Sequence, residues 1–313
     1  MTMRTVAAFI VVATTLHVPA TADQSPAPAP LFQANGQRHH YKMSARIRPL
    51  LFWIGRDDVG DAIVVKRQDS DGVSLSLLIG SDPEKAPRQI NRWGYIDEEI
   101  HGDAATLIGL MSESDEESVG QAEANIRKQG GQRVFKVIRG SIADGEARSV
   151  VTSVAAPADY TFRHAPTVLD LANGESPDSG TRVVRLPPGT RPGFLVTLAD
   201  MIHAQVDQWQ TSRQVTAGDP LHFVYHGRLY ELRVTRTRAV SDARVGRRTY
   251  AHALTSQFQI KNLGDGELTD FSMTYAADGP LTETPLGITF RPRWWLEVRL
   301  TLDDDAPGQP PAR

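Results

Sequence analysis

Hydrophobic and polar residues alternate with a period of two along most of the chain, most clearly toward the C-terminus. Between residues 250 and 302, two turns, Gly264-Asp265-Gly266 and Asp278-Gly279-Pro280, interrupt the alternation. Period-two runs between such turns are typical of half-buried antiparallel strands. We therefore predict an antiparallel meander whose core-facing set is Tyr250, His252, Leu254, Phe258, Ile260, Phe271, Met273, Tyr275, Leu286, Ile288, Phe290, Trp294, Leu296, Val298 and Leu300.

The N-terminal half shows the same pattern in shorter runs. Candidate strands there cover residues 41–48, 62–67, 73–79, 90–96, 104–110 and 132–139. A helix is predicted over residues 115–129, because Ser114 and Glu117 are spaced as a capping box and Gly130-Gly131 supplies a stop. Its apolar stripe is thin, so we expect it on the surface.

Residues 194–210 carry a stronger helical pattern. At helical spacing, one arc of roughly 80° contains Leu195, Leu198, Ile202, Val206 and Trp209. Such a stripe predicts a helix that covers an apolar sheet face. The fold class that follows is mainly β with a few helices: an antiparallel meander sheet, curved into a half-barrel and covered by this amphipathic helix.

The first residues have the pattern of a secretory signal peptide. Arg4 precedes an uncharged apolar run at residues 6–16, and Pro19-Ala20-Thr21-Ala22 supplies a small-residue cleavage pattern. A membrane-spanning helix needs about 20 apolar residues, so the run is too short to be one. The order predicted along the chain is a signal peptide (1–22), a Pro/Ala-rich linker (23–38), an N-terminal β-rich lobe with one helix (39–156), a Pro/Gly-rich junction (157–193), the C-terminal helix and meander (194–302) and a disordered tail (303–313).

The composition narrows the functional classes. The chain has 313 residues, no cysteine and a net charge of -3. Without cysteine there is no disulfide, thiolate metal site, cysteine nucleophile or lipidated N-terminal cysteine. The small net charge gives no argument for a nucleic-acid partner, and no second apolar run predicts a transmembrane segment in the mature chain. Familiar hydrolase, zinc-protease and nucleotide motifs are absent, and no cofactor or metal is expected.

Four residues are candidates for catalysis. Asp200, His203 and Asp207 share one side of the 194–210 helix, where a histidine between two carboxylates suits a metal or an oriented base. The same spacing also suits a solvated face with helical ion pairs. His252 falls on the predicted apolar face of its strand, which fits a satisfied core histidine, a cavity-lining residue or a catalytic one.

Other polar patterns carry weaker predictions. His222 and His226 would lie about 13 Å apart on one strand face, too far to share a zinc ion, and we expect both to be exposed. The run Asp57-Asp58-Val59-Gly60-Asp61 lacks the ligand spacing of a calcium loop. Acidic residues cluster at 97–117 and arginines at 228–248; both clusters fit solvated faces, a partner surface or the steering of an anionic ligand.

Two stretches resemble a known group of proteins. The run Phe52-Trp53-Ile54-Gly55-Arg56-Asp57-Asp58-Val59-Gly60-Asp61-Ala62, with 78–83 and 90–95, resembles a group of uncharacterised exported bacterial β-rich proteins. Residues 221–302, with their polar strand, Pro285-Leu286 turn and final amphipathic strand, are similar in pattern to periplasmic domains that resemble the half-barrels of lipoprotein carriers. The resemblance implies an open half-barrel with a helix over an apolar cavity, and no functional residues.

The leading hypothesis is a non-enzymatic periplasmic or secreted β protein that binds a lipid or other apolar envelope ligand. The side chains predicted to line its cavity are Tyr250, His252, Phe258, Phe271, Tyr275 and Trp294. One alternative is a structural or protein-interaction module of the cell envelope, with another envelope protein as partner. The other is a hydrolase with a His/Asp site.

Overall fold

The computed structural model of this chain describes residues 36–47, 54–68, 70–112, 131–178, 180–293 and 296–303. The strands of its first half are β1 (Gln37–Ile47), β2 (Ile54–Gln68), β3 (Val73–Ser81), β4 (Trp93–His101), β5 (Ala104–Ser112), β6 (Gln132–Ala143), β7 (Glu146–Pro157) and β8 (Arg182–Arg185). Those of the second half are β9 (Leu221–Tyr225), β10 (Arg228–Val240), β11 (Ala243–Val245), β12 (Arg248–Tyr250), β13 (Ala253–Asn262), β14 (Leu268–Ala276), β15 (Pro285–Arg293) and β16 (Leu296–Leu302). The helices are η1 (Pro87–Gln89), η2 (Phe162–His164), α2 (Ala165–Leu171) and α3 (Phe194–Ser212).

One large antiparallel sheet contains strands from both halves of the chain. Its 14 strands run in the order β8-β7-β6-β5-β4-β3-β2-β1-β16-β15-β14-β13-β10-β9, and β11 and β12 form a separate small sheet. The halves join where β1 pairs with β16, with Tyr41 opposite Leu302. The mainly β, antiparallel prediction is therefore confirmed. Because β8 and β9 each have only one named neighbour in this sheet, the sheet is not closed.

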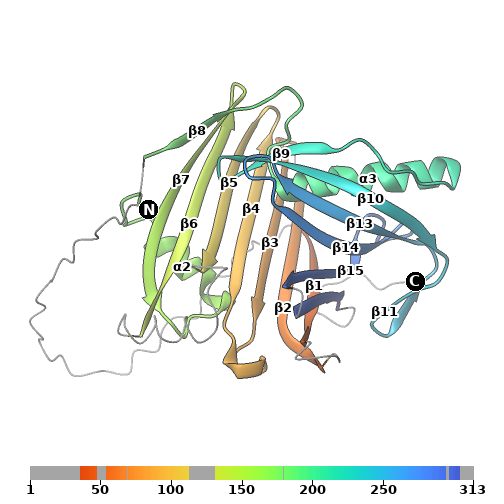
Figure 1. The fold of residues 1–313 in the computed structure, drawn as a ribbon, viewed down its shortest axis with the longest axis horizontal. Helices are drawn as coiled ribbons and strands as arrows, with labels where there is room; N and C mark the ends of the chain where they lie inside the picture. Colours follow the sequence, from red (N-terminus) through yellow and green to blue (C-terminus); the bar gives the residue numbers. More distant parts are fainter. Residues whose placement is uncertain are drawn as a thin grey trace, which may run out of the picture.

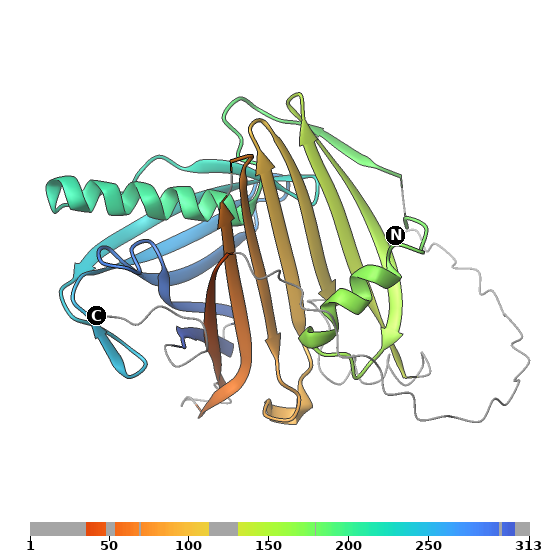
Figure 2. The ribbon, with the colours of Figure 1, turned by 180° about the vertical axis from the view of Figure 1, so that it is seen from behind.

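The sheet curves so that its two halves extend in different directions (Figure 1). Strands β3 to β7 stand side by side in one half, while β10 and β13 to β15 reach away in the other, with α3 alongside them (Figures 1 and 2). The 194–210 helix of the sequence prediction is α3, and it extends to Ser212. No helix among the described residues is long and apolar enough to cross a membrane.

Apolar clusters cover both faces of the sheet. On one face of β3–β7, η2 and α2 pack against a cluster that includes Trp93 and Phe135, whose rings lie 5.0 Å apart. A Cβ at Gly80 would overlap the ring of Phe162, so a glycine there allows this close approach. The other face packs against α3, whose Ile202, Val206 and Trp209 are buried on β10, β13 and β14.

The edge strand β9 packs against strands at the opposite end of the curved sheet, but it forms no hydrogen-bonded ladder with them in the described sheet. Val224 packs with Ala105, Ile142 and Ala147 of β5–β7, and an isolated parallel bridge joins Arg191 to Phe223. The hairpin of β9 and β10 thus rests on strands that are far from it in the order of the sheet. This contact brings the two ends of the open sheet together.

Several local predictions need correction or lie outside the described residues. The sequence prediction had no strand at β7 or β8 and no helix at α2, although β8 and α2 both lie within the 157–193 junction. Glu297, between the inward-facing Leu296 and Val298, is buried and pairs with Arg291 at 2.8 Å. The signal peptide, the linker up to residue 35, the 115–129 helix, Trp294 and the tail beyond residue 303 fall outside the description.

Candidate functional site

The aromatic residues predicted to line a cavity belong to the core beneath α3. Phe258, Phe271 and Tyr275 are buried, and the rings of Phe258 and Phe271 stack 5.0 Å apart. Burial raises the pKa of Tyr275 to about 12, and its hydroxyl lies 2.7 Å from Ser256 Oγ. Tyr250 is half-buried on β12, in a different cluster. Side chains of α3 pack on this face in the same cluster.

His252 does not lie on the apolar face, and that prediction is wrong. Pairing of β13 begins at Ala253, and the bend before it breaks the alternation that the sequence seemed to continue from Tyr250. The His252 side chain is 49% exposed, with Nε2 3.8 Å from the Asp278 carboxylate. Its ring lies 5.5 Å from that of Trp209, at the outer end of the core.

The polar face of α3 forms two separate surface ion pairs. Asp200 pairs with Arg191 at 3.1 Å, and His203 Nδ1 lies 2.6 Å from Glu283 Oε1. The hydrogen bond to Glu283 raises the pKa of His203, and the charges of Asp207 and Asp200 add smaller effects. Glu283 is 80 residues away in sequence, so helical spacing could not reveal it. Both pairs fasten α3 to neighbouring loops.

His226 lies in a turn rather than in a strand with His222. Residues Tyr225 and Arg228 pair across the β9–β10 hairpin, and both His226 (φ 53°) and Gly227 (φ 62°) have left-handed backbone angles. Positive φ at both central residues defines the type I′ turn that suits a two-residue hairpin. The His226 ring stacks on Tyr225 at 4.0 Å, and its Nε2 is buried. Only His222 is exposed as predicted.

This turn forms one wall of an open groove of about 600 Å³. The opposite wall is the face of β5–β7 that carries Met111, Ile138 and Val151, with the strand β8 beside it. A Cβ at Gly227 would overlap Ser149 Oγ and Arg182 Cδ, so glycine lets the turn approach β7 and β8. The complete lining is Met111, Lys136, Ile138, Ser149, Val151, Gly180, Arg182, His226, Arg228 and Tyr230.

The charged side chains that line the groove are all cationic. Burial, together with smaller effects of the nearby charges of Arg228 and Arg182, lowers the pKa of His226 to about 4. The ring is therefore neutral at ordinary pH. Burial raises the pKa of Tyr230, whereas Arg228 opposes this shift through its charge and a hydrogen bond to the hydroxyl. The groove thus combines apolar surface with hydrogen-bonding and positively charged groups.

The fold of this chain is similar to that of a solved protein. No protein-family model matches the chain, and no curated protein sequence matches it. A crystal structure described as a beta-barrel-like protein of a domain of unknown function, DUF1849, from Brucella abortus is similar over 85% of this chain and 95% of that one. The identity is 11% and the TM-score 0.45.

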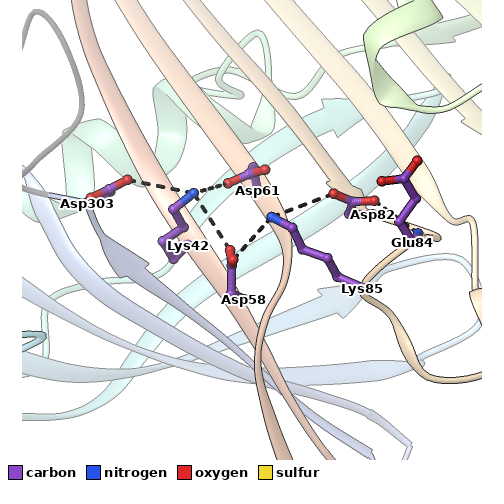
Figure 3. Close-up of polar contacts among 7 residues, drawn as sticks. All are labelled: Lys42, Asp58, Asp61, Asp82, Glu84, Lys85 and Asp303. Carbon is purple, nitrogen blue, oxygen red and sulfur yellow. Dashed lines mark hydrogen bonds and ion pairs between the residues drawn. The ribbon is translucent and has the colours of Figure 1, made fainter.

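The acidic run at residues 57–61 belongs to an ion-pair network rather than a cation loop (Figure 3). Lys42 on β1 reaches Asp61 at 2.9 Å and Asp58 at 3.7 Å, and Lys85 reaches Asp58 at 3.1 Å. Asp303 lies 3.9 Å from Lys42. The two ammonium groups offset part of the negative charge of these three carboxylates, where β1 and β2 meet the end of β16. Among the described residues, no group of three or more histidines and carboxylates is arranged to hold a metal.

The acidic cluster at 97–117 does not form one surface in its described part. Asp97 accepts a hydrogen bond from the Ser76 hydroxyl and lies beside Tyr95. Glu98 points to the opposite face and is fully buried against α3. Glu99 pairs with Arg67 at 3.4 Å. Strand alternation separates the neighbours, as the period of two requires.

Sequence reasoning missed the groove residues because they come from five separate stretches of the chain. The signal available was local: His226-Gly227 between two alternating strands is a hairpin turn of the kind that favours glycine. That signal places the turn, but it does not show that β5–β7 lie opposite it.

Proposed function

We propose that this chain is an exported, non-enzymatic β protein that binds an apolar envelope ligand in the groove between the β9–β10 hairpin and β5–β7. The observation that carries the proposal is the groove itself. Its volume of about 600 Å³ falls within the range of roughly 300–1,000 Å³ that is common for small-ligand sites. Met111, Ile138, Val151 and Tyr230 supply apolar surface for a hydrocarbon chain.

The position of the groove supports a binding role. It forms where the two ends of an open sheet meet, and the hairpin contacts the other end through packing of Val224 and a hydrogen bond from Arg182 to the backbone oxygen of His226. Binding sites are common at such meeting points between structural units.

The geometry supports binding better than hydrolysis. Ser149 and His226 both line the groove, but within the described part of the chain no hydrogen bond joins His226 Nε2 to any partner. A serine nucleophile needs its base within hydrogen-bond reach. The His203–Glu283 pair lies on the exposed face of α3, away from the groove lining. The N-terminal pattern of residues 1–22 supports export to an envelope compartment.

The test is a titration of the purified mature chain with myristoyl-lysophosphatidylcholine, kept below the micelle concentration of the lipid. Isothermal titration calorimetry measures the binding. We expect saturable binding with one ligand per chain. Val151→Trp should fill the groove and weaken binding by about tenfold or more. Val183→Trp is the matched control, because Val183 is 51% exposed on β8 and outside the groove lining. An absence of saturable binding both by this lipid and by its lysophosphatidylglycerol analogue, or equal loss in both variants, overturns the proposal.

A further inference from the structure

Three cationic side chains from separate strands converge on the groove. Lys136 comes from β6, Arg182 from β8 and Arg228 from the start of β10. No carboxylate is among the lining residues that the structure describes. Such a concentration of one charge in a concave, partly apolar site favours an anionic ligand, since low-dielectric walls strengthen the local field.

The two arginines are held by neutral partners. Arg182 Nη1 donates to the backbone oxygen of His226 at 3.4 Å, and Arg228 donates to the hydroxyl of Tyr230. Over the described ranges, neither guanidinium forms an ion pair with a carboxylate. Their charge therefore remains uncompensated beside the groove. A guanidinium is suited to bidentate contacts with phosphate or carboxylate oxygens.

Acidic groups near the groove are engaged elsewhere. Asp178 accepts hydrogen bonds from the Ser153 backbone N–H at 2.8 Å and hydroxyl at 2.6 Å, which lower its pKa together with the charge of Lys136. The charges of Asp265 and Glu267 raise the pKa of Tyr230, and neither residue lines the groove. These carboxylates reduce the positive field without occupying the space between the arginines.

His226 supplies a neutral polar group at the same place. Its Nε2 is buried and has no hydrogen-bond partner among the described residues. Leaving a buried polar atom without a partner costs free energy, and this atom lies close to Gly109 of β5, so the ring meets the groove as a neutral aromatic wall. Because the ring is neutral, it can serve as donor or acceptor according to its tautomer.

We propose that the groove binds an amphiphile with an anionic phosphate or carboxylate head group. This inference rests on the proposed function and adds the chemistry of the ligand. The head group lies between Arg182 and Arg228, with His226 as the neutral contact. The acyl chain lies along Met111, Ile138 and Val151 in the apolar part of the same groove.

The experiment compares probes that share a chain or a charge. Myristoyl-lysophosphatidylglycerol and myristate are anionic, myristoyl-lysophosphatidylcholine has the same chain with a zwitterionic head, and inorganic phosphate has no chain. We expect the anionic amphiphiles to bind about tenfold or more tightly than the zwitterionic one, with a preference that weakens as salt rises. Inorganic phosphate should bind far more weakly than either.

Variants then test the assigned residues. Arg182→Gln and Arg228→Gln should each reduce the preference for the anionic head by about fivefold or more, while binding of the zwitterionic probe changes little. Arg185→Gln, on the same strand β8 but outside the lining, is the control. Circular dichroism and melting temperature check that each variant folds, and two independent arginines keep the test valid if one variant fails.

The outcomes separate the two proposals. Equal binding of the anionic and zwitterionic lipids overturns the head-group inference and leaves the proposed function intact. Failure of every lipid to bind overturns the proposed function. Phosphate that binds as tightly as lysophosphatidylglycerol identifies a site for a free anion and overturns the amphiphile. An unchanged preference in both arginine variants shows that the head group lies elsewhere.

Discussion

The carboxylate of Glu98 on β4 accepts a hydrogen bond from the backbone N–H of Leu195, with 2.9 Å between Oε1 and the nitrogen. Its second oxygen accepts from Val196, also at 2.9 Å. Glu98 therefore caps the first turn of α3 from the other half of the chain, satisfying N–H groups that a helix start leaves unpaired. The side chain is fully buried, so this contact fixes where the helix enters the curved sheet.

The first prediction concerns the pH dependence of folding. Burial raises the pKa of Glu98 from 4.5 to about 7, although the helix N–H groups oppose the shift. Between these values the folded state holds a proton that the unfolded state has lost, so stability falls as pH rises through this window and then levels off. The contribution is about 3 kcal/mol at most.

Glu98→Gln should remove this component, because an amide does not titrate. Urea unfolding from pH 4 to pH 8 gives the free energy of unfolding of the wild type and of the variant. The contribution of Glu98 is the change with pH in the difference between these two free energies. Asp103→Asn, on an exposed turn, is the control and should follow the wild type. Parallel curves for Glu98→Gln and wild type contradict the prediction.

The second prediction tests the space beside the cap. Gly193 has an extended backbone that any residue adopts, but a Cβ there would overlap the Glu98 carboxylate. Gly193→Ala should therefore destabilise the protein by about 1–3 kcal/mol through overpacking. In a Glu98→Ala background the overlap is gone, and the same change should cost within about 0.5 kcal/mol. An equal penalty in both backgrounds, measured by denaturant unfolding, contradicts the assigned contact.

These residues show what the sequence could and could not reveal about the fold. Alternation placed β1 and the strands of the C-terminal meander, because a half-buried strand must alternate. It placed α3 through the stripe that includes Ile202 and Val206. It could not show that Glu98 meets Leu195, since 97 residues separate them. A burial pattern reports which face is covered, and it carries no information about which distant element covers it.

The candidate site was less predictable for the same reason. Phe258, Phe271 and Tyr275 were correctly placed on a covered face, but a packed core and an open cavity share one apolar pattern. The groove depends on Arg182, His226 and Arg228, which are polar residues beside short or edge strands. Their meeting follows from the curvature of the sheet, which no local pattern specifies.

A third prediction separates the two faces of α3. Ile202 is buried against the sheet, whereas the His203 side chain is 68% exposed. Ile202→Asp buries an unpaired carboxylate and should cost several kcal/mol, about 3 or more. His203→Ala removes only a surface pair with Glu283 and should change stability by within about 1 kcal/mol.

The same two variants also test the hydrolase hypothesis. The binding proposal requires that His203→Ala fold normally and retain the affinity for lysophospholipid. Thermal unfolding and the calorimetric titration measure both properties. Loss of a reproducible turnover in a well-folded His203→Ala protein would replace the binding role with a catalytic one.

The last prediction concerns β16, which joins the two halves of the sheet. It pairs with β1 on one side and β15 on the other, and its Val298, Leu300 and Leu302 are buried. Fully burying each such side chain contributes about 1.5–3 kcal/mol, and the sum is comparable with the roughly 5–15 kcal/mol stability of a whole domain. Ending the chain at residue 295 should therefore abolish cooperative unfolding, whereas ending it at Asp303 removes only the predicted tail and should leave the melting temperature unchanged. Circular dichroism during heating distinguishes the two, and a shortened chain without β16 that still melts cooperatively at the wild-type temperature shows that the halves hold together by other contacts.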